Sequence, residues 1–161
     1  MQRIVIFGNA GAGKTTLARQ LAQSGELAHL DLDLLAWLPG PPPQRRSLAD
    51  SARDIAQFTS HNPAWVIEGC YSDLLELVLP ECSDILFLNP GVEACLANCR
   101  ARPWEPSKYA SKAEQDANLE LLLQWVRAYD TREDEFSLRS HRRLFKSFDG
   151  PKREIGAPAL R

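Results

Sequence analysis

One glycine-rich segment near the start of the chain restricts the possible folds more than any other feature. Residues 8–15 read GNAGAGKT, which matches the phosphate-binding loop G-x-x-x-x-G-K-[ST] at every fixed position. Residues 4–7 (IVIF) before it form a short β-branched and aromatic run, which is typical of a strand buried in a parallel sheet. Residues 15–23 after it place apolar side chains on one face of a predicted helix. A strand, a glycine loop and a helix N-terminus therefore follow one another in the order that phosphate binding requires.

The residues of this loop have distinct expected roles. Glycines can adopt positive φ, so the backbone amides can face a phosphate, and the first turn of the helix adds free N–H groups. We expect Lys14 to reach the terminal phosphates of a nucleoside triphosphate and the Thr15 hydroxyl to ligate Mg²⁺. The alternative is a structural strand–turn–helix corner with a chance lysine. The predicted nucleotide-binding residues here are Gly8, Asn9, Ala10, Gly11, Ala12, Gly13, Lys14, Thr15 and Thr16.

Length and composition indicate a single soluble domain. The 161 residues suit one domain over positions 1–161, and a hydrophobic content of 44% with 25% charged residues is ordinary for a globular protein. The formal net charge of −2 leaves no basic footprint, which argues against direct nucleic-acid binding. No apolar run approaches the ~20 residues that span a bilayer, and the N-terminus leads directly into a strand. We therefore expect no membrane segment, no signal peptide and a cytoplasmic location.

The cysteines and histidines are predicted to be structural. The four cysteines lack C-x-x-C spacing and have no histidine close to them in sequence, so buried, reduced thiols are favoured over a metal site. The three histidines show no ligand or catalytic spacing. These residues are Cys70, Cys82, Cys95, Cys99, His29, His61 and His141.

Apolar runs alternate with helical patterns along the chain, which predicts an α/β fold with a parallel sheet and helices on both faces. Ser47 and Ser111 are predicted to cap the helices that follow them, and a proline cluster at 39–43 is predicted to form an exposed turn. From Gly156 onward we expect a frayed tail. Further strands are predicted at 28–33, 64–68, 84–88 and 152–155, and further helices at 48–59, 73–79, 91–100, 112–126 and 138–148.

Acidic side chains gather where predicted strands end, and ligands of open parallel sheets bind at these carboxyl ends. Asp31 and Asp33 point the same way in an extended chain, and such carboxylates can hold Mg²⁺ or orient an attacking hydroxyl. Strand ends also favour aspartate for turn formation alone. Glu68 follows the third strand and is either a turn carboxylate or an acidic group of the nucleotide site. Whether Glu68 or Asp31 is the main magnesium ligand stays open.

Basic side chains follow the fourth strand and its helix. Arg100 and Arg102 are expected to face the phosphates, where cations neutralise the charge on a transferring phosphoryl group. Residues 101–112 have prolines but no helical or strand period, so we predict a lid loop that is mobile without ligand. Four other arginines are surface charges by default, and whether any of them reaches the site stays open. They are Arg127, Arg132, Arg142 and Arg143.

Four segments together resemble the small P-loop kinases related to adenylate and shikimate kinases. They read RIVIFGNAGAGKTTLARQLAQ, HLDLDLLAWLPG, WVIEGCYSD and DILFLNPGVEACLANCRARPWEP, in this order. Within that family the chain is most similar to bacterial proteins described as AAA-family ATPases, shikimate-kinase-like proteins or DNA topology modulation proteins. The resemblance covers most of the chain and is strong through about Arg102.

This resemblance implies a three-layer P-loop NTPase fold with a five-stranded parallel sheet in the order 2-3-1-4-5 and a short lid. It also implies roles for three residues: Asp31 for Mg²⁺, Asp33 for the accepting hydroxyl, and Arg102, in an Arg-Pro pair that opens the lid, for the phosphates. The chain departs from shikimate kinases after the third strand, where Glu68-Gly69-Cys70-Tyr71 replaces their glycine run. Shikimate itself is therefore not indicated as the acceptor.

The sequence predicts an ATP- and Mg²⁺-dependent enzyme that transfers a phosphoryl group to a small hydroxyl- or phosphate-bearing acceptor. Lys14, Asp33 and Arg102 are its predicted catalytic residues, and Thr15 and Asp31 its predicted metal ligands. The alternative is an ATP-dependent regulatory switch similar to the DNA topology modulation proteins. An aspartate pair at the acceptor position favours the enzyme, because a switch needs no acceptor site.

Overall fold

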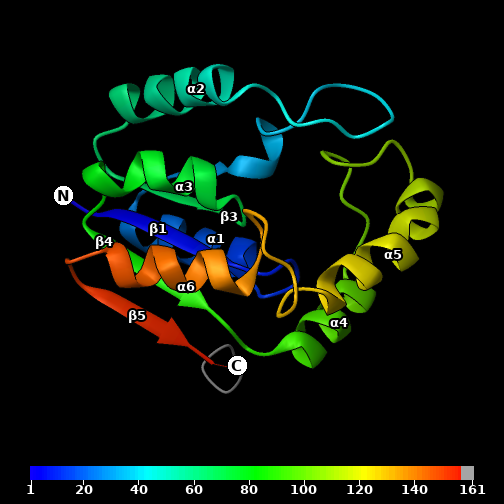
Figure 1. Ribbon diagram of the computed structural model, residues 1–161. Coiled ribbons are helices and arrows are strands. Elements are labelled where there is room, and N and C mark those ends of the chain that lie inside the picture. Colours follow the sequence, from blue (N-terminus) through cyan, green and yellow to red (C-terminus); the bar gives the residue numbers. More distant parts are fainter. Residues whose placement is uncertain (157–161) are drawn as a thin grey trace.

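The computed structural model describes residues 1–156 (Figure 1). The frayed tail predicted after Gly156 falls on residues 157–161, which lie outside the described residues. Within residues 1–156 five strands form one parallel sheet in the order β2-β3-β1-β4-β5, so the predicted α/β class and strand order are confirmed. The strands are β1 Arg3–Gly8, β2 Ala28–Asp31, β3 Trp65–Gly69, β4 Asp84–Leu88 and β5 Lys152–Ile155.

Helices cover both faces of the sheet (Figure 1). The α-helices are α1 Lys14–Gly25, α2 Leu48–His61, α3 Ser72–Val78, α4 Val92–Ala101, α5 Lys112–Arg127 and α6 Leu138–Ser147, and two short 3-10 helices are η1 Leu32–Leu34 and η2 Leu79–Glu81. Side chains alternate along the strands, so Val5 and Phe7 pack with α2, α3 and α6, whereas Ile4 and Ile6 pack with α1, α4 and α5. Burial of the central strand on both faces gives the three-layer architecture that the sequence predicts.

Helix starts follow the serine signals of the sequence. The Ser47 hydroxyl accepts a hydrogen bond from the Asp50 N–H (3.1 Å), and Ser111 accepts one from Glu114 (3.1 Å), so both predicted caps are confirmed. The short helix predicted over 73–79 is confirmed to within one residue at each end: α3 runs from Ser72 to Val78, and the chain then tightens into η2 around Pro80.

The second strand is shorter than predicted. It ends at Asp31, whose carboxylate accepts a hydrogen bond from the Asp33 N–H (2.9 Å) and so starts the 3-10 turn η1. The expected extended alternation through residue 33 is therefore wrong, since the Asp31 side chain competes with the strand for the backbone donor. Among the described residues, no helix is long and apolar enough to cross a membrane.

Candidate functional site

The glycine loop turns sharply between β1 and α1. Gly11 has a φ of +81°, and a Cβ at this position would lie 2.3 Å from the Cys95 carbonyl oxygen, so only glycine fits. Gly13 stands at the N-cap of α1 with a φ of +95°. The Lys14 ammonium donates a hydrogen bond to the Asn9 carbonyl (2.7 Å) across the loop. The loop therefore turns tightly at Gly11 and Gly13, and the Lys14 side chain folds back onto the loop backbone.

The N-terminus of α1 has no side-chain cap. Serine side chains cap α2, α5 and α6, whereas among the described residues α1 and α4 begin at glycines, Gly13 and Gly91, without a side-chain cap. The first N–H groups of a helix need partners, and they carry the positive end of the helix dipole. The start of α1, which contains Thr15 and Thr16, is thus suited to an anion such as a phosphate.

Two asparagines fasten the loop to the helices behind it. The Asn9 side-chain amide donates to the Val126 carbonyl in α5 (3.3 Å), and Asn98 in α4 donates to the Gly11 carbonyl (2.8 Å). Cys95 and Cys99 are buried in the same layer, which confirms the predicted packing role of these thiols. Helices α4 and α5 therefore both hold the glycine loop by a side-chain hydrogen bond.

Asp31 and Asp33 meet at one lysine of the lid loop. The Lys108 ammonium lies 3.2 Å from Asp31 Oδ2 and 2.7 Å from Asp33 Oδ2, and Glu105 Oε2 is 3.6 Å away. The two aspartates thus lie together as the sequence predicts, although through a turn and not through an extended strand; that they form a functional site stays a prediction. Among residues 1–156, no group of three or more His, Cys, Asp or Glu side chains is placed to hold a metal ion by itself.

The surroundings shift the pKa values of these groups in opposite directions. Burial and the neighbouring Asp33 and Glu68 carboxylates raise the pKa of Asp31. Burial alone would raise the pKa of Asp33 as well, but the Lys108 charge, hydrogen bonds from Lys108 and Tyr71, and the more distant Lys14 charge hold it below its usual value. Burial opposes ionisation of Lys108, yet the Asp33 and Asp31 carboxylates raise its pKa. Asp33 and Lys108 are thus both charged at neutral pH.

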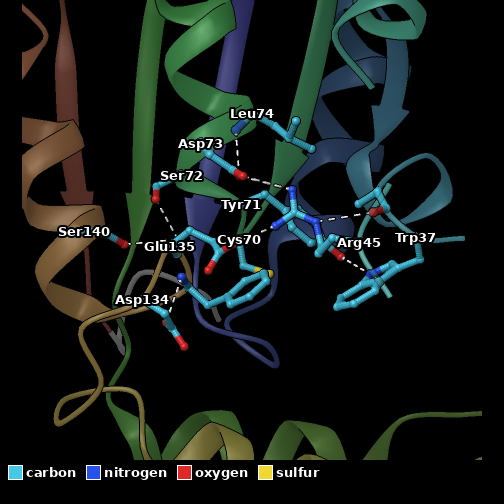
Figure 2. A network of polar contacts seen from close by, with 12 residues as sticks. Trp37, Arg45, Cys70, Tyr71, Ser72, Asp73, Leu74, Asp134, Glu135 and Ser140 are labelled. Atoms are coloured by element: carbon cyan, nitrogen blue, oxygen red, sulfur yellow. Dashed lines mark hydrogen bonds and ion pairs between the residues drawn. The ribbon is translucent and has the colours of Figure 1, made fainter. Parts of the chain in front are cut away.

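Asp33 also connects to an aromatic cluster. The Tyr71 hydroxyl donates to Asp33 Oδ1 (2.5 Å) and accepts a hydrogen bond from Trp37 Nε1 (2.8 Å). Figure 2 shows Arg45 reaching past Tyr71 to Asp73 and Glu135. The Arg45 guanidinium lies 4.8 Å from the centroid of the Tyr71 ring. The orientation of Asp33 is thus fixed by residues from three separate segments.

Glu68 lies at the end of β3 beside Asp31 of β2 and is buried. One of its carboxylate oxygens is 2.9 Å from His29 Nε2. Glu68 therefore has a hydrogen-bond partner in the neighbouring strand β2. This contact partly offsets the cost of burying its carboxylate. Glu68 still contributes a negative charge beside Asp31.

The two predicted phosphate-facing arginines lie at the end of α4. Arg100 is exposed in its last turn. Arg102 is half-buried, with its guanidinium 3.4 Å from Glu105 and 4.0 Å from the sulfur of Cys99, which packs behind Gly11. Arg102 therefore stands where α4 passes into the lid loop, close to the glycine loop, whereas Arg100 is exposed one residue before the end of α4.

The lid loop is fastened to α5. Residues 102–111 form a loop as predicted, whereas Ala101 belongs to α4 and Lys112 to α5. Gln115 accepts a hydrogen bond from the Glu105 N–H (2.8 Å) and donates one to the Pro103 carbonyl (3.0 Å). Trp104 Nε1 donates to the Tyr109 carbonyl (3.1 Å), and the Trp104 side chain remains 42% exposed. That the lid loop is mobile without ligand stays a prediction.

The other arginines occupy different places. Arg127 and Arg142 are exposed and pair with Glu120 (3.7 Å) and Glu154 (3.2 Å), and Arg143 is exposed. Arg132 packs over the Trp125 ring at 4.2 Å and donates to the Trp125 carbonyl (2.7 Å) at the end of α5. None of these contacts involves the glycine loop or the aspartate pair.

Three residues of the site are absent from the sequence predictions: Trp37, Arg45 and Glu135. Their partners lie 28 to 90 positions away along the chain. Lys108 lies within the predicted lid loop, and its contact with the aspartates spans 75 positions. A motif of neighbouring residues carries no signal for such contacts. The Glu68–Tyr71 segment offers the one local hint, because it places a tyrosine next to the carboxyl end of β3.

Comparison with known proteins identifies the fold. No protein-family model matches the chain, and no curated protein does. A gluconokinase from Sinorhizobium meliloti 1021 matches with a TM-score of 0.54 and 16% identity, over 97% of this chain and 82% of that one. An unliganded sugar kinase from Janibacter sp. HTCC2649 matches with a TM-score of 0.53 and 14% identity, over 98% and 86%. A deoxyadenosine kinase from M. mycoides with bound dATP matches with a TM-score of 0.50 and 12% identity, over 98% and 92%. The chain therefore has the fold of small P-loop kinases.

Proposed function

We propose, from this small P-loop kinase fold, that the protein is an ATP- and Mg²⁺-dependent kinase that transfers a phosphoryl group to a hydroxyl or phosphate group of a small acceptor. The observation that supports this most is the position of Asp33, an ionised carboxylate at the sheet edge within the electrostatic reach of Lys14. A glycine loop alone serves any nucleotide-binding protein. A carboxylate close to the glycine loop can in addition accept the proton of an attacking hydroxyl, which is what a kinase requires.

The donor side of the proposed site is built mainly from backbone. The positive φ of Gly11 and Gly13 and the uncapped start of α1 fit a chain of phosphates, with N–H groups as donors. Lys14, now bonded to the Asn9 carbonyl, is placed to exchange that contact for phosphate oxygens. Thr15 and Asp31 would hold Mg²⁺, which supplies positive charge to the phosphates when bound.

On the acceptor side, Asp33 orients the nucleophile. Tyr71 fixes one carboxylate oxygen, and Lys108 keeps the group ionised, so the other oxygen can accept a proton once the lysine moves aside. Arg102, at the junction with the lid, would neutralise the charge of the phosphoryl group in transfer, and Arg100 would assist from the outer side. Closure of residues 101–112 would exclude water, which otherwise hydrolyses ATP without an acceptor.

The test is ADP release by the purified 161-residue chain with ATP, Mg²⁺ and a panel of hydroxyl compounds, comparing Lys14→Ala with Lys146→Ala. Lys146 is exposed in α6, so its loss controls for the removal of one lysine charge. We expect Lys14→Ala to lower acceptor-stimulated turnover by at least about 10²-fold, the scale of one preorganised charge, and Lys146→Ala to leave it unchanged. ATP hydrolysis that no acceptor stimulates would favour the regulatory switch over the kinase.

A further inference from the structure

Both carboxylate oxygens of Asp33 have a hydrogen-bond donor from within the chain. The Tyr71 hydroxyl lies 2.5 Å from Oδ1, and the Lys108 ammonium lies 2.7 Å from Oδ2. Tyr71 is buried and accepts a hydrogen bond from Trp37 Nε1 (2.8 Å), so its contact with Asp33 belongs to the packed interior. Lys108 belongs to the lid loop, so it is the donor that can move away. A hydroxyl that gives its proton to Asp33 must therefore compete with this ammonium.

Lys108 makes the polar contact between the lid loop and the sheet edge. Within residues 1–156, every other hydrogen bond or ion pair of residues 102–111 stays inside the loop or goes to α4 or α5. The loop is folded into a turn, since the Lys108 and Tyr109 N–H groups both donate to the Glu105 carbonyl (3.0 Å each). Loss of the Lys108 ammonium would therefore remove the polar contact that holds the lid against the aspartates.

The Lys108 ammonium lies among three carboxylates. In addition to Asp33 it is 3.2 Å from Asp31 Oδ2 and 3.6 Å from Glu105 Oε2, and its side chain is only 19% exposed. Attraction between partly buried charges is screened less than attraction between exposed ones, so the contact persists when no ligand competes for it. Glu105 also lies 3.4 Å from Arg102, so the arginine proposed to neutralise the phosphoryl group is paired in the same state.

Water is the competing acceptor in a site of this kind. In hydrolysis the water oxygen would bond to the γ-phosphorus, the bond from that phosphorus to the bridging oxygen would break with its electron pair left on ADP, and one water proton would pass to Asp33. A hydroxyl acceptor would follow the same steps with its own proton. The two differ in how they can displace the lysine, because water offers no further contacts whereas an acceptor gains binding energy from its remaining atoms.

Resting on the proposed kinase function, we infer that Lys108 is the residue that selects the acceptor over water. Without an acceptor the ammonium stays on Asp33 Oδ2, so bound ATP meets no carboxylate that can take a proton from water. An acceptor in its site displaces the ammonium, and its hydroxyl takes the position next to Oδ2. Mg²⁺ at Asp31 would weaken only the longer of the two aspartate contacts. Lys108 thus makes the proton acceptor available when the phosphoryl acceptor has bound.

The first experiment measures phosphate release from ATP without any acceptor, at a Mg²⁺ concentration that saturates each variant. Lys108→Met removes the donor, and it should raise this hydrolysis rate at least about 10-fold, a part of the effect of about 10²- to 10⁴-fold that a positioned base has. Lys112→Met is the matched control, because Lys112 is exposed and pairs with Asp116, and it should leave the rate unchanged. An unchanged or lower rate in folded Lys108→Met overturns the inference.

A double variant shows whether the added hydrolysis depends on Asp33. When Asp33→Asn is combined with Lys108→Met, hydrolysis should return to the wild-type level, because an amide cannot take the proton of water. Asp130→Asn in the same Lys108→Met background is the control, since Asp130 is exposed, and there the rate should stay high. Hydrolysis that stays high in the Asp33→Asn combination would come from an open lid alone, and this result also overturns the inference.

The panel of hydroxyl compounds separates this inference from the proposed function. Where a compound stimulates ADP release by the wild-type chain, Lys108→Met should lower the ratio of stimulated to acceptor-free turnover by at least about 10-fold. An unchanged ratio contradicts the selection by Lys108 and leaves the kinase intact. Where no compound stimulates either the wild-type chain or Lys108→Met, the proposed kinase function fails instead.

Hydrogen exchange tests the contact without turnover. In the ligand-free chain, the backbone amides of residues 104–111 should exchange at least about 3-fold faster in Lys108→Met than in the wild type, because the lid loses a partly buried ion pair. Asp33→Asn should speed the same amides, since it removes the charge of the partner, whereas Lys112→Met should match the wild type. Equal exchange in the wild type and in both variants of the pair would show that Lys108 does not hold the lid, which overturns the inference.

Discussion

Lys108 Nζ lies 2.7 Å from Asp33 Oδ2, although the two residues are 75 positions apart in the chain. The same ammonium lies 3.2 Å from Asp31, so one lysine of the lid pairs with both aspartates of the proposed metal and acceptor site. A divalent cation and this lysine would therefore compete for the same carboxylates.

We predict that Lys108→Met lowers the Mg²⁺ concentration needed for half-maximal turnover by about 5-fold, which corresponds to an interaction of about 1 kcal/mol. Methionine keeps the side-chain length but removes the competing charge. The measurement is a magnesium titration at fixed ATP. Lys112→Met is the control, because Lys112 is 71% exposed and pairs with Asp116 away from the site. An increased magnesium requirement would contradict the competition.

A second prediction separates the roles of the two aspartates. Asp31→Asn should raise the Mg²⁺ requirement of ATP turnover, whereas Asp33→Asn should preserve nucleotide affinity and lower the acceptor-stimulated rate by at least about 10²-fold. Magnesium titrations and nucleotide binding measure the two effects. The exposed Asp130, changed to Asn, controls for the loss of one charge. Equal effects of both substitutions on both measurements would refute divided roles.

The third prediction concerns Arg102 at the start of the lid. Arg102→Ala should lower the rate of phosphoryl transfer more than it weakens ATP affinity, because its charge is needed most during transfer. Single-turnover kinetics measures the rate of phosphoryl transfer, and a nucleotide-binding titration measures the ATP affinity. Arg53→Ala is the control, as Arg53 is 72% exposed on α2. A loss of ATP affinity with an unchanged transfer rate would remove Arg102 from the catalytic residues.

Gly11 gives a stability prediction that needs no substrate. Gly11→Ala adds the strain of positive φ and a Cβ 2.3 Å from the Cys95 carbonyl oxygen, whereas Gly40→Ala adds comparable strain at φ +84° in open space. Left-handed backbone costs an ordinary residue about 1–2 kcal/mol, so Gly40→Ala measures that part alone. Thermal unfolding should show a larger loss for Gly11→Ala. Equal losses of stability in the two variants would mean that α4 shifts away from the added Cβ at little cost.

His141 predicts how stability depends on pH. It is buried, with Nδ1 2.7 Å from the Tyr129 hydroxyl and Nε2 2.8 Å from the Cys70 carbonyl, and burial lowers its pKa from 6.5 to about 4. The unfolded chain therefore binds a proton below pH 6.5 that the folded chain refuses until about pH 4.

The low pKa of His141 should lower the free energy of unfolding by up to about 3 kcal/mol as the pH falls from about 6.5 to about 4. Above pH 6.5 it should have no effect. Denaturant unfolding at several pH values measures the effect. His141→Gln should lower stability at pH 7 yet flatten its decline at acidic pH, while His61→Gln, at an exposed position of α2, should keep the wild-type profile. An unchanged acid profile in His141→Gln would refute the linkage.

The features that the sequence predicts correctly depend on neighbouring residues. The glycine loop, the serine caps and the apolar runs of β1 and β4 are each encoded within a few positions, so local pattern suffices for them. The end of β2 is mispredicted because the Asp31 side chain competes for the Asp33 N–H. That contact is local but does not appear in a hydrophobic pattern.

The acceptor side could not be predicted in the same way. Trp37 lies between η1 and α2, Tyr71 directly before α3 and Phe136 just before α6, so their meeting depends on how three separate segments pack together. Arg45 finds Glu135 across 90 positions. Only the folded chain defines such contacts.

The glycine loop and the surroundings of Asp33 are built differently, and this difference affects how such a protein can evolve. The glycine loop is one continuous stretch, and on the proposed function its backbone N–H groups would hold the phosphates. Trp37, Tyr71 and Phe136 come from separate segments, and among these three only Trp37 is exposed. On the proposed function, an exchange at an exposed position such as Trp37 would therefore change the surroundings of Asp33 while the glycine loop stays in place.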